Sequence, residues 1–415
     1  MSRWDPDPLA ADSTTRVSGE ELALRLGVRP DRVERLADSA VIERDADGRF
    51  DLGDVHRLRL LLAFETAGVP LEALIEGSRV GAISLQYYDQ LHPTPGPLSG
   101  NSYAEFRASA DPGGVHLPQL FAAIGLAEPE AGTQLTVEDE RLLADMLATI
   151  AETGHPDLAL RAIRMFGDGA RRAADGALGA YREAVDRIGD GVAGLPVDAV
   201  YERQLKPWAR FAQRSGTYAG WLAARHLTRA IDEYSVTETE RVLEEAGYVA
   251  ARLEAPPAVA FVDLTGFTRL TEQRGDEVAA AIAMRLGELT TDTVGRQGGK
   301  VVKLLGDGVL VRFDDASAAA DATLDLLAAL VSADLPSGHA GLASGPLIVR
   351  DGDIFGRTVN LAARVADATP DGHLYAPENV ASVLKPDRFE LRPTDGALLQ
   401  GIGQVALVDV VRARA

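Results

Sequence analysis

Hydrophobic residues recur at intervals of three or four over most of residues 17–253, a pattern that is typical of amphipathic helices. Pro256 and Pro257 interrupt this pattern and mark a predicted domain boundary. In residues 258–415, short β-type runs such as AVAFVDL and GVLVRF alternate with alanine-rich helical stretches. The alternation predicts an α+β or α/β domain, a mixed sheet with flanking helices, C-terminal to an all-α region.

The first helical region is predicted to fold as a small helix-turn-helix module. Ser18, followed by two glutamates, is a typical helix start, and DADGRFDL has the Asp-Gly turn of a small hairpin or wing. We therefore predict a disordered tail over residues 1–16 and a winged helix-turn-helix over residues 17–90. Residues 91–116 are rich in Pro, Gly and Ser, which predicts a linker.

Beyond the predicted linker the helical pattern recurs. The segment LPQLFAAIGL parallels ELALRLGV, and the stretch that starts at LTVEDER parallels the one that starts at FDLGDVHR. These parallels suggest an internal repeat whose second copy lacks an obvious wing. Residues 117–253 are predicted to form a helical regulatory domain, and its last part, residues 236–253, is the predicted coupling helix to the C-terminal domain, residues 254–415.

Charge and composition narrow the classes of partner and compartment. With 62 acidic residues against 42 Lys and Arg, the formal net charge is −20, so the chain repels nucleic acid and anionic membranes unless a local basic patch prevails. The absence of cysteine excludes disulfides, thiolate zinc sites and thiol nucleophiles. The N-terminus is polar and no apolar run approaches about 18 residues, so we expect a cytoplasmic protein without a membrane span. The seven scattered histidines are interpreted as structural or surface residues.

Candidate chemistry begins at FVDLTGFTRL, where a predicted strand ends in a carboxylate and a helix follows at once. Asp263 closes the strand, and the turn into the helix consists of Thr265, Gly266, Phe267 and Thr268. Free N–H groups at a helix start can hold phosphate, while the carboxylate can hold a metal ion that the phosphate also binds. The alternative is that Asp263 merely caps the helix.

A second carboxylate lies in VVKLLGDGVLVRF. Gly306, Asp307 and Gly308 join two apolar runs, which predicts a hairpin with an acidic tip. An Asp-Gly pair usually serves only the turn. Two features favour a functional role: a second carboxylate is available to share metal ions with Asp263, and Lys303 interrupts an apolar strand where an unpaired ammonium group is costly.

The third group of polar residues lies in DGDIFGRTVNLAARV. Asp353 precedes a turn, and Asn360 and Arg364 are four residues apart on the following predicted helix, hence on one face. On an alanine-rich helix, an amide beside a guanidinium suits an anionic, oxygen-rich ligand. The alternative is a polar stripe that faces solvent.

Together and in this order, the three motifs resemble the catalytic domain of class III adenylate and guanylate cyclases, over about residues 258–412. The resemblance implies cyclisation of ATP to 3′,5′-cyclic AMP with release of pyrophosphate. It also implies two divalent metal ions, Mg²⁺ or Mn²⁺, as cofactors and a head-to-tail homodimer with two shared sites. The implied roles are metal binding for Asp263 and Asp307, purine recognition for Lys303 and Asp353, ribose orientation for Asn360, and stabilisation of charge on the α-phosphate for Arg364.

Two details of the resemblance bear on the substrate. Lys303 and Asp353 fit ring nitrogen N1 and the exocyclic amine of adenine, whereas guanylate cyclases of the family usually carry Glu and Cys-type residues there. Near the C-terminus, the Leu-Lys-Gly or Leu-Arg-Gly motif of many members reads Leu399, Gln400, Gly401 in this chain. The missing cation predicts weak binding of the terminal phosphates and a high KM for ATP.

The N-terminal half shows two further resemblances. Residues 117–250 are loosely similar to the helical regulatory region of actinobacterial cyclases that respond to pH and fatty acids, which implies a small-molecule, lipid or pH signal. Residues 17–75 are similar to the helix-turn-helix of MerR-type regulators, and seven arginines are enough for a basic patch: Arg16, Arg25, Arg29, Arg32, Arg35, Arg44 and Arg49. One helical segment carries four aromatic residues, interpreted as core rather than as a pocket lining: Trp208, Phe211, Tyr218 and Trp221.

A rival hypothesis is a DNA-binding or ligand-sensing regulator with a weak or vestigial cyclase domain. Gln400 and the MerR-like module favour it, and the intact metal, purine and transition-state positions oppose it. Within the MerR-like module, a dimerisation or sensor role is favoured over DNA binding. A guanylate cyclase is a nearer alternative, disfavoured by Lys303 together with Asp353.

Overall fold

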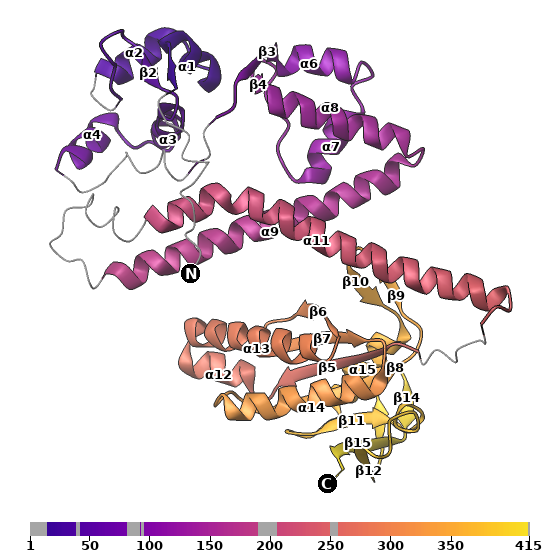
Figure 1. Cartoon of the computed structure of the whole chain (residues 1–415). Helices are drawn as coiled ribbons and strands as arrows, with labels where there is room; N and C mark the ends of the chain where they lie inside the picture. Colours follow the sequence, from indigo (N-terminus) through magenta and orange to yellow (C-terminus); the bar gives the residue numbers. More distant parts are fainter. Residues whose placement is uncertain are drawn as a thin grey trace, which may run out of the picture. The chain divides into compact units, whose positions relative to one another are not determined.

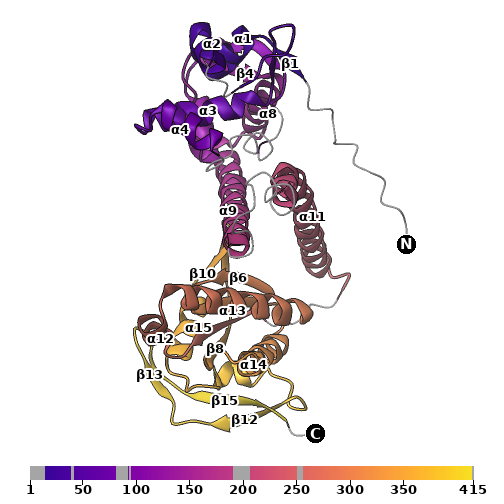
Figure 2. The same ribbon diagram turned by 90° about the vertical axis from the view of Figure 1, so that its left-hand side faces the viewer.

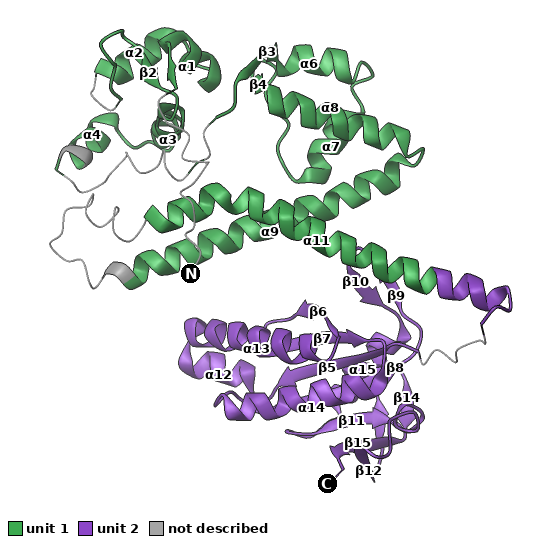
Figure 3. Ribbon diagram, viewed as in Figure 1, with its two compact units in different colours: residues 1–238 green, residues 239–415 purple. Residues whose placement is uncertain are grey.

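The chain divides into two compact units, residues 1–238 and 239–415 (Figure 3). The division falls within helix α11 (Lys206–Glu245), upstream of the predicted boundary at residue 254, which lies outside the described residues. Most of the predicted disordered tail also lies outside them. The computed structural model describes residues 15–38, 42–80, 92, 95–189, 206–249 and 256–413 (Figure 1).

The C-terminal unit is built on a seven-stranded mixed sheet, which confirms the predicted sheet with flanking helices (Figure 1). Strands β11 and β8 are parallel, and the other neighbours in the sheet are antiparallel. In spatial order the strands are β12 (Phe389–Pro393), β15 (Leu407–Arg412), β11 (Leu374–Pro377), β8 (Gly338–Ser344), β5 (Ala258–Leu264), β7 (Gly308–Phe313) and β6 (Lys300–Leu304).

Helices and two small hairpins complete this unit. The hairpins are β9 (Ile348–Arg350) with β10 (Asp353–Phe355) and β13 (Ala397–Leu399) with β14 (Gly403–Val405). The helices are α12 (Phe267–Arg274), α13 (Asp276–Arg296), α14 (Ala316–Ser332), α15 (Arg357–Asp367) and the single turn α16 (Glu378–Ala381).

Strand β5 lies at the centre of the packing because both of its faces are covered. Ala260 and Val262 belong to the core that contains α13 and α14, whereas Val259 belongs to the core that contains α15. Gly341 on β8 allows α15 to lie directly on the sheet, since a Cβ at this position would be 2.2 Å from the Ala366 nitrogen. This close approach fixes the helix that carries Asn360 and Arg364.

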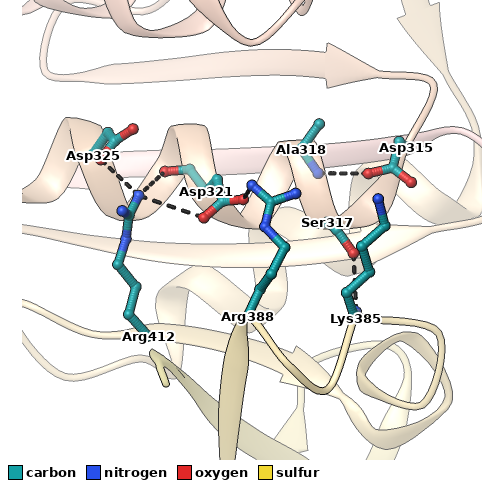
Figure 4. A network of polar contacts seen from close by, with 8 residues as sticks. All are labelled: Asp315, Ser317, Ala318, Asp321, Asp325, Lys385, Arg388 and Arg412. Carbon is teal, nitrogen blue, oxygen red and sulfur yellow. Dashed lines mark hydrogen bonds and ion pairs between the residues drawn. The ribbon is translucent and has the colours of Figure 1, made fainter. Parts of the chain in front are cut away.

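A buried carboxylate ties α14 to the C-terminal strands (Figure 4). The side chain of Asp321 on α14 is only 7% exposed and forms ion pairs with Arg388, which precedes β12, and with Arg412 at the end of β15. Arg412 also pairs with Asp325, one helical turn further along α14, at 2.6 Å. A buried charge is tolerated when it is paired, so these arginines hold the edge of the sheet against α14.

The first module of the N-terminal unit is predominantly helical, as predicted. Strand β1 (Arg16–Val17) pairs with β2 (Phe50–Asp51), and Ser18 caps the first helix by accepting a hydrogen bond from the Glu21 nitrogen. At the predicted wing the chain forms a turn at Asp45. Within residues 42–80 this turn is not flanked by two paired strands, so no hairpin forms there. The helices are α1 (Gly19–Leu26), α2 (Pro30–Asp38), α3 (Asp54–Thr66) and α4 (Leu71–Arg79).

The prediction of a linker over residues 91–116 is wrong for most of that stretch. Strand β3 (Leu98–Ser102) and helix α6 (Tyr103–Ala110) lie within it, and the side chains of Tyr103 and Phe106 are buried in a core. The Pro and Gly residues only bracket this element, whereas a capping box between Ser102 and Glu105 starts the helix. A composition averaged over the whole stretch hid that local signal.

The predicted internal repeat is present, but its alignment differs from the expected one. After β3 and α6 come α7 (His116–Ile124), β4 (Gln134–Thr136), α8 (Val137–Glu152) and α9 (Pro156–Gly189). The order strand, two helices, strand, two helices is therefore that of the first module, and β4 pairs with β3 as β2 pairs with β1. Ser102 and Glu105 repeat Ser18 and Glu21, so α6 corresponds to α1 and the predicted match of α7 to α1 is one helix out of step. The other predicted parallel, of LTVEDER with FDLGDVHR, agrees with this order, because α8 occupies the place of α3.

Helix α11 is a long single helix (Figure 2), and three of its four aromatic residues that were predicted to be core are exposed. The indole of Trp221 is 59% exposed, and of all forty residues in this helix only Ala209 is buried. Phe211 packs edge-on against Trp208 at 6.2 Å and lies 6.0 Å from Tyr218, so the rings contact one another along the helix. Apolar spacing predicts a helix face but not what covers it.

Among the described residues, every helix is too short or too polar to span a membrane.

Candidate active site

The two candidate metal-binding aspartates lie next to each other at one end of the sheet. Asp263 is opposite Gly308 in the register of β5 and β7, and the Leu264 nitrogen donates to the Asp307 carbonyl oxygen at 2.9 Å. A Cβ on Gly308 would lie 2.8 Å from Asp263 Oδ1, so glycine at this position leaves room for the carboxylate. The β6–β7 turn is therefore more than a tight connection, because it places Asp307 beside Asp263.

The electrostatics of this pair favour a cation. Burial raises the pKa of Asp263, and the nearby charge of Asp307 raises it further, while His339 acts in the opposite direction. Carboxylate oxygens are the ligands that Mg²⁺ and Mn²⁺ prefer, so the donor set fits such an ion. No group of three or more His, Asp or Glu side chains gathers as a complete metal site within the described ranges. The two aspartates would therefore need water, backbone or substrate oxygens as further ligands.

The turn from β5 into α12 excludes the capping role for Asp263. Gly266 occupies the N-cap position with φ of 70°, which favours glycine, and no side chain caps this helix. Phe267 is half-buried against the core, and Thr268 is exposed. Thr265 was predicted to offer a free N–H group to phosphate. Its nitrogen instead donates to the Ser337 carbonyl oxygen at 2.7 Å.

The predicted purine-reading residues form an ion pair. Lys303 on β6 contacts the carboxylate of Asp353 on β10, and Asp353 Oδ1 also accepts from the Ile354 nitrogen at 2.9 Å. The hydrogen bond from Lys303 is the main cause that holds the pKa of Asp353 below its usual value. The ammonium group that interrupts the apolar run therefore has a partner, but Lys303 is exposed, so the expected cost of an unpaired charge does not apply.

Asn360 and Arg364 both lie on α15 and are exposed, four residues apart. Arg364 Nη1 donates to Asp367 Oδ2 on the same helix at 2.9 Å. Among the described residues, neither side chain has a hydrogen bond or ion pair to the two aspartates or to the purine-reading pair. Within one copy of the chain, the six predicted site residues thus form three separate groups. These are the two aspartates, the Lys303–Asp353 pair, and Asn360 with Arg364 on one face of α15.

Two residues near Asp263 were missed by the sequence analysis. His339 on β8 is opposite Asp263 in the sheet, with Nε2 4.0 Å from Asp263 Oδ2. Asp371, in the loop after α15, accepts the hydroxyl of Thr265 at 2.6 Å. The interpretation of all histidines as structural or surface residues did not consider the place of His339 beside Asp263. Strand register was the missing signal, since 76 positions of sequence separate Asp263 from His339.

Gln400 occupies the exposed turn between β13 and β14, where the resemblance placed a phosphate-binding cation.

The predicted basic patch of the first module is weakened, because six of its seven arginines form ion pairs with acidic side chains. These pairs are Arg16–Asp45, Arg25–Glu21, Arg29–Asp31, Arg32–Glu65, Arg35–Asp31 and Arg44 with Glu34 and Asp38.

Comparison with known proteins supports the reaction class. The chain is 40% identical over 114 residues to an adenylate cyclase of Streptomyces coelicolor, which is 27% of this chain and 30% of that protein. The chain has adenylate cyclases among its homologues. It spans about a third of the length of the first such relatives. No family model matches it.

Two further matches are a relative that aligns over most of this chain and a solved structure. An uncharacterized protein of Mycobacterium tuberculosis is 27% identical over 334 residues, which cover 79% of this chain and 83% of that protein. The crystal structure of an adenylyl cyclase from P. aeruginosa matches 39% of this chain and 95% of its own, at 23% identity and a TM-score of 0.36.

Proposed function

We propose that this chain is an adenylate cyclase, which converts ATP to 3′,5′-cyclic AMP and pyrophosphate at sites shared by two copies of the chain. The observation that carries the proposal is the pairing of Asp263 with Asp307 at the end of the central strands, on the same domain as the Lys303–Asp353 ion pair. The adenylate cyclase relatives support the same reaction class.

Asp263 and Asp307 would hold two divalent ions, Mg²⁺ or Mn²⁺. When bound, such ions lower the pKa of the ribose 3′-hydroxyl and neutralise the triphosphate. The raised pKa of Asp263 supports this role, because two adjacent carboxylates without a cation repel each other. The free N–H groups at the start of α12 would bind phosphate, with Gly266, Phe267 and Thr268 closest to it.

Lys303 and Asp353 would select adenine by the direction of their hydrogen bonds. The Lys303 ammonium would donate to N1, and the Asp353 carboxylate would accept from the exocyclic amine. Their present ion pair involves an exposed lysine, and exposed pairs are worth only about 0–1 kcal/mol. Opening the pair for the base is therefore cheap, and the two groups are already close together.

Asn360 would orient the ribose and Arg364 would stabilise charge on the α-phosphate. Because one copy does not bring them into contact with Asp263 or Asp307, we assign them to the opposite subunit of a homodimer. Arg364 would then exchange its exposed contact with Asp367 for the phosphate, where a low-dielectric site makes the charge more effective.

The N-terminal unit is proposed to regulate this activity through α11, the last part of which contains the first residues of the predicted coupling helix. The candidate place for a small-molecule signal is an open pocket of about 330 Å³ beside α6, whose lining includes Tyr103, Arg107, Asp111 and Glu128. The rival role in DNA binding is less favoured, because the paired arginines leave little unbalanced positive charge for phosphate.

The test is formation of cyclic nucleotide from Mn-ATP and Mn-GTP by the full chain. We expect cyclic AMP from ATP only, and a loss of at least about 100-fold in Asp307→Ala, because a metal ligand is removed. Asp314→Ala is the matched control: this aspartate directly follows β7, is exposed and pairs with Arg312, so activity should stay within about twofold. Unchanged activity in Asp307→Ala, or no product from a folded dimer, would contradict the proposal.

A further inference from the structure

His339 lies beside the candidate metal pair but outside every motif of the sequence. It is directly opposite Asp263 in the pairing of β5 and β8, and its side chain is only 17% exposed. The Asp263 carboxylate thus lies between two strands, with Oδ1 toward Gly308 on β7 and Oδ2 toward the His339 ring on β8.

The hydrogen bonds around His339 determine which ring nitrogen carries the proton. The Thr265 hydroxyl has one hydrogen, and it donates this hydrogen to Asp371 Oδ1 at 2.6 Å. Thr265 Oγ1 can therefore only accept from His339 Nδ1, which is 3.2 Å away. A ring with a single hydrogen then carries it on Nδ1 and presents the lone pair of Nε2 toward Asp263, whereas a protonated ring carries a second hydrogen on Nε2.

This arrangement is the one that supports a metal-binding histidine. Such a histidine donates its second ring nitrogen to a fixed acceptor, which sets the tautomer and the ring orientation. Here Thr265 is that acceptor, and Asp371 holds the hydroxyl in place. A carboxylate and a nitrogen lone pair that face each other repel, unless a proton or a metal ion lies between them.

The distance between the two donors also fits a shared ion. In six-coordinate geometry with bonds of about 2.1 Å, two ligands lie about 3 Å apart when adjacent and about 4.2 Å apart when opposite. The 4.0 Å between His339 Nε2 and Asp263 Oδ2 is close to the distance expected for two opposite ligands. No third His, Asp or Glu side chain completes the set among the described residues, so water or phosphate oxygens would fill the other positions.

We propose that His339 Nε2 and Asp263 Oδ2 bind one divalent ion together, and that this nitrogen ligand makes the site prefer Mn²⁺ over Mg²⁺. Mn²⁺ is a transition-metal ion and accepts an imidazole nitrogen more readily than Mg²⁺, which prefers oxygen ligands. The inference rests on the proposed function in one respect: the ion is one of those that Asp263 would hold when ATP binds. Thr265 and Asp371 are positioning residues, because they act on the ion through His339.

The test observes the ligand rather than the reaction. Mn²⁺ alone is added to an excess of full-length protein, and electron spin echo modulation detects nitrogen bound to the ion. We expect imidazole modulation that changes when histidine is labelled with ¹⁵N and that disappears in His339→Ala. The matched control is His373→Ala, since His373 is on the neighbouring segment and contacts Asp409 instead, and this variant should keep the modulation.

Affinities measured by calorimetry complete the test. In His339→Ala we expect the Kd for Mn²⁺ to rise about tenfold and the Kd for Mg²⁺ to change less than about twofold. Bound Mn²⁺ without imidazole modulation, equal losses for both metals, or no Mn²⁺ binding at millimolar concentration would each overturn the inference. Cyclic AMP formation by a protein without that modulation would overturn this inference alone, whereas nitrogen-ligated Mn²⁺ without cyclic AMP would overturn the proposed function alone.

Discussion

Lys303 on β6 and Asp353 on β10 form an ion pair although fifty residues separate them in the sequence. The pair presents one donor and one acceptor side by side, which is the polarity that the N1 and amine edge of adenine requires. Guanine presents the reverse polarity at the same two atoms. Base selectivity is therefore expected to depend on the direction of these two hydrogen bonds.

Exchanging that polarity should change the substrate. The double variant Lys303→Glu with Asp353→Cys should shift the ratio of kcat/KM for ATP and GTP toward GTP by at least about tenfold, since a correct pair of hydrogen bonds discriminates bases by about 1–3 kcal/mol. Steady-state cyclisation of both nucleotides measures the ratio. Lys300→Glu reverses a charge on the same strand and should leave it unchanged. An unshifted ratio in the double variant would exclude these residues from base recognition.

Asp263→Asn should abolish cyclisation yet raise the thermal stability of the metal-free protein. Burial and Asp307 raise the pKa of Asp263 in the folded chain, so its contribution to stability is complete below the unfolded pKa and is lost as pH rises through the raised value. The amide of asparagine does not ionise, so the variant does not lose this stability as pH rises. Calorimetry in EDTA should show a higher Tm for the variant at pH 7.5, with the difference shrinking in acid. An equal or lower Tm at pH 7.5 would contradict the electrostatic account.

Gln400→Arg should restore a cation where the resemblance expects one. The exposed turn between β13 and β14 allows the new side chain to reach solvent without a change in the fold. Because exposed charge interactions are worth about 0.2–1 kcal/mol, we expect KM for ATP to fall by up to about fivefold at low salt, with kcat nearly constant. Gln400→Met is the uncharged control. A gain that persists at high salt would not come from the charge.

Arg388→Ala should destabilise the C-terminal unit, because it removes one of two partners of the buried Asp321 carboxylate (Figure 4). Loss of a partner of a buried ion costs about 3–5 kcal/mol; with Arg412 still present and Arg388 itself 39% exposed, we expect about 1–3 kcal/mol. Urea unfolding measures this change. Arg392→Ala, whose partner Glu390 is exposed, should cost less than about 1 kcal/mol. Equal costs for both variants would show that burial of Asp321 is not important.

Much of the C-terminal domain was determined by local sequence. The β-type runs and alanine-rich stretches predict the mixed sheet with flanking helices, because alternation and helical spacing are local properties. The candidate site residues were chosen through motif order, and the structure pairs Asp263 with Asp307 and Lys303 with Asp353. Three of these four residues lie at a strand end or in a turn, and Lys303 interrupts an apolar run, which makes them visible in the sequence.

Tertiary structure decided what depends on neighbours that are distant in the chain. His339 faces Asp263 only because β8 pairs with β5 in one register, and Tyr103 is buried only because β3 and α6 fold into a second module. The aromatic stripe of α11 shows the same limit in reverse, since its spacing predicted a buried face and the structure exposes Trp221. Spacing along a chain determines which side chains share a face, whereas burial and contact depend on which segment packs against that face.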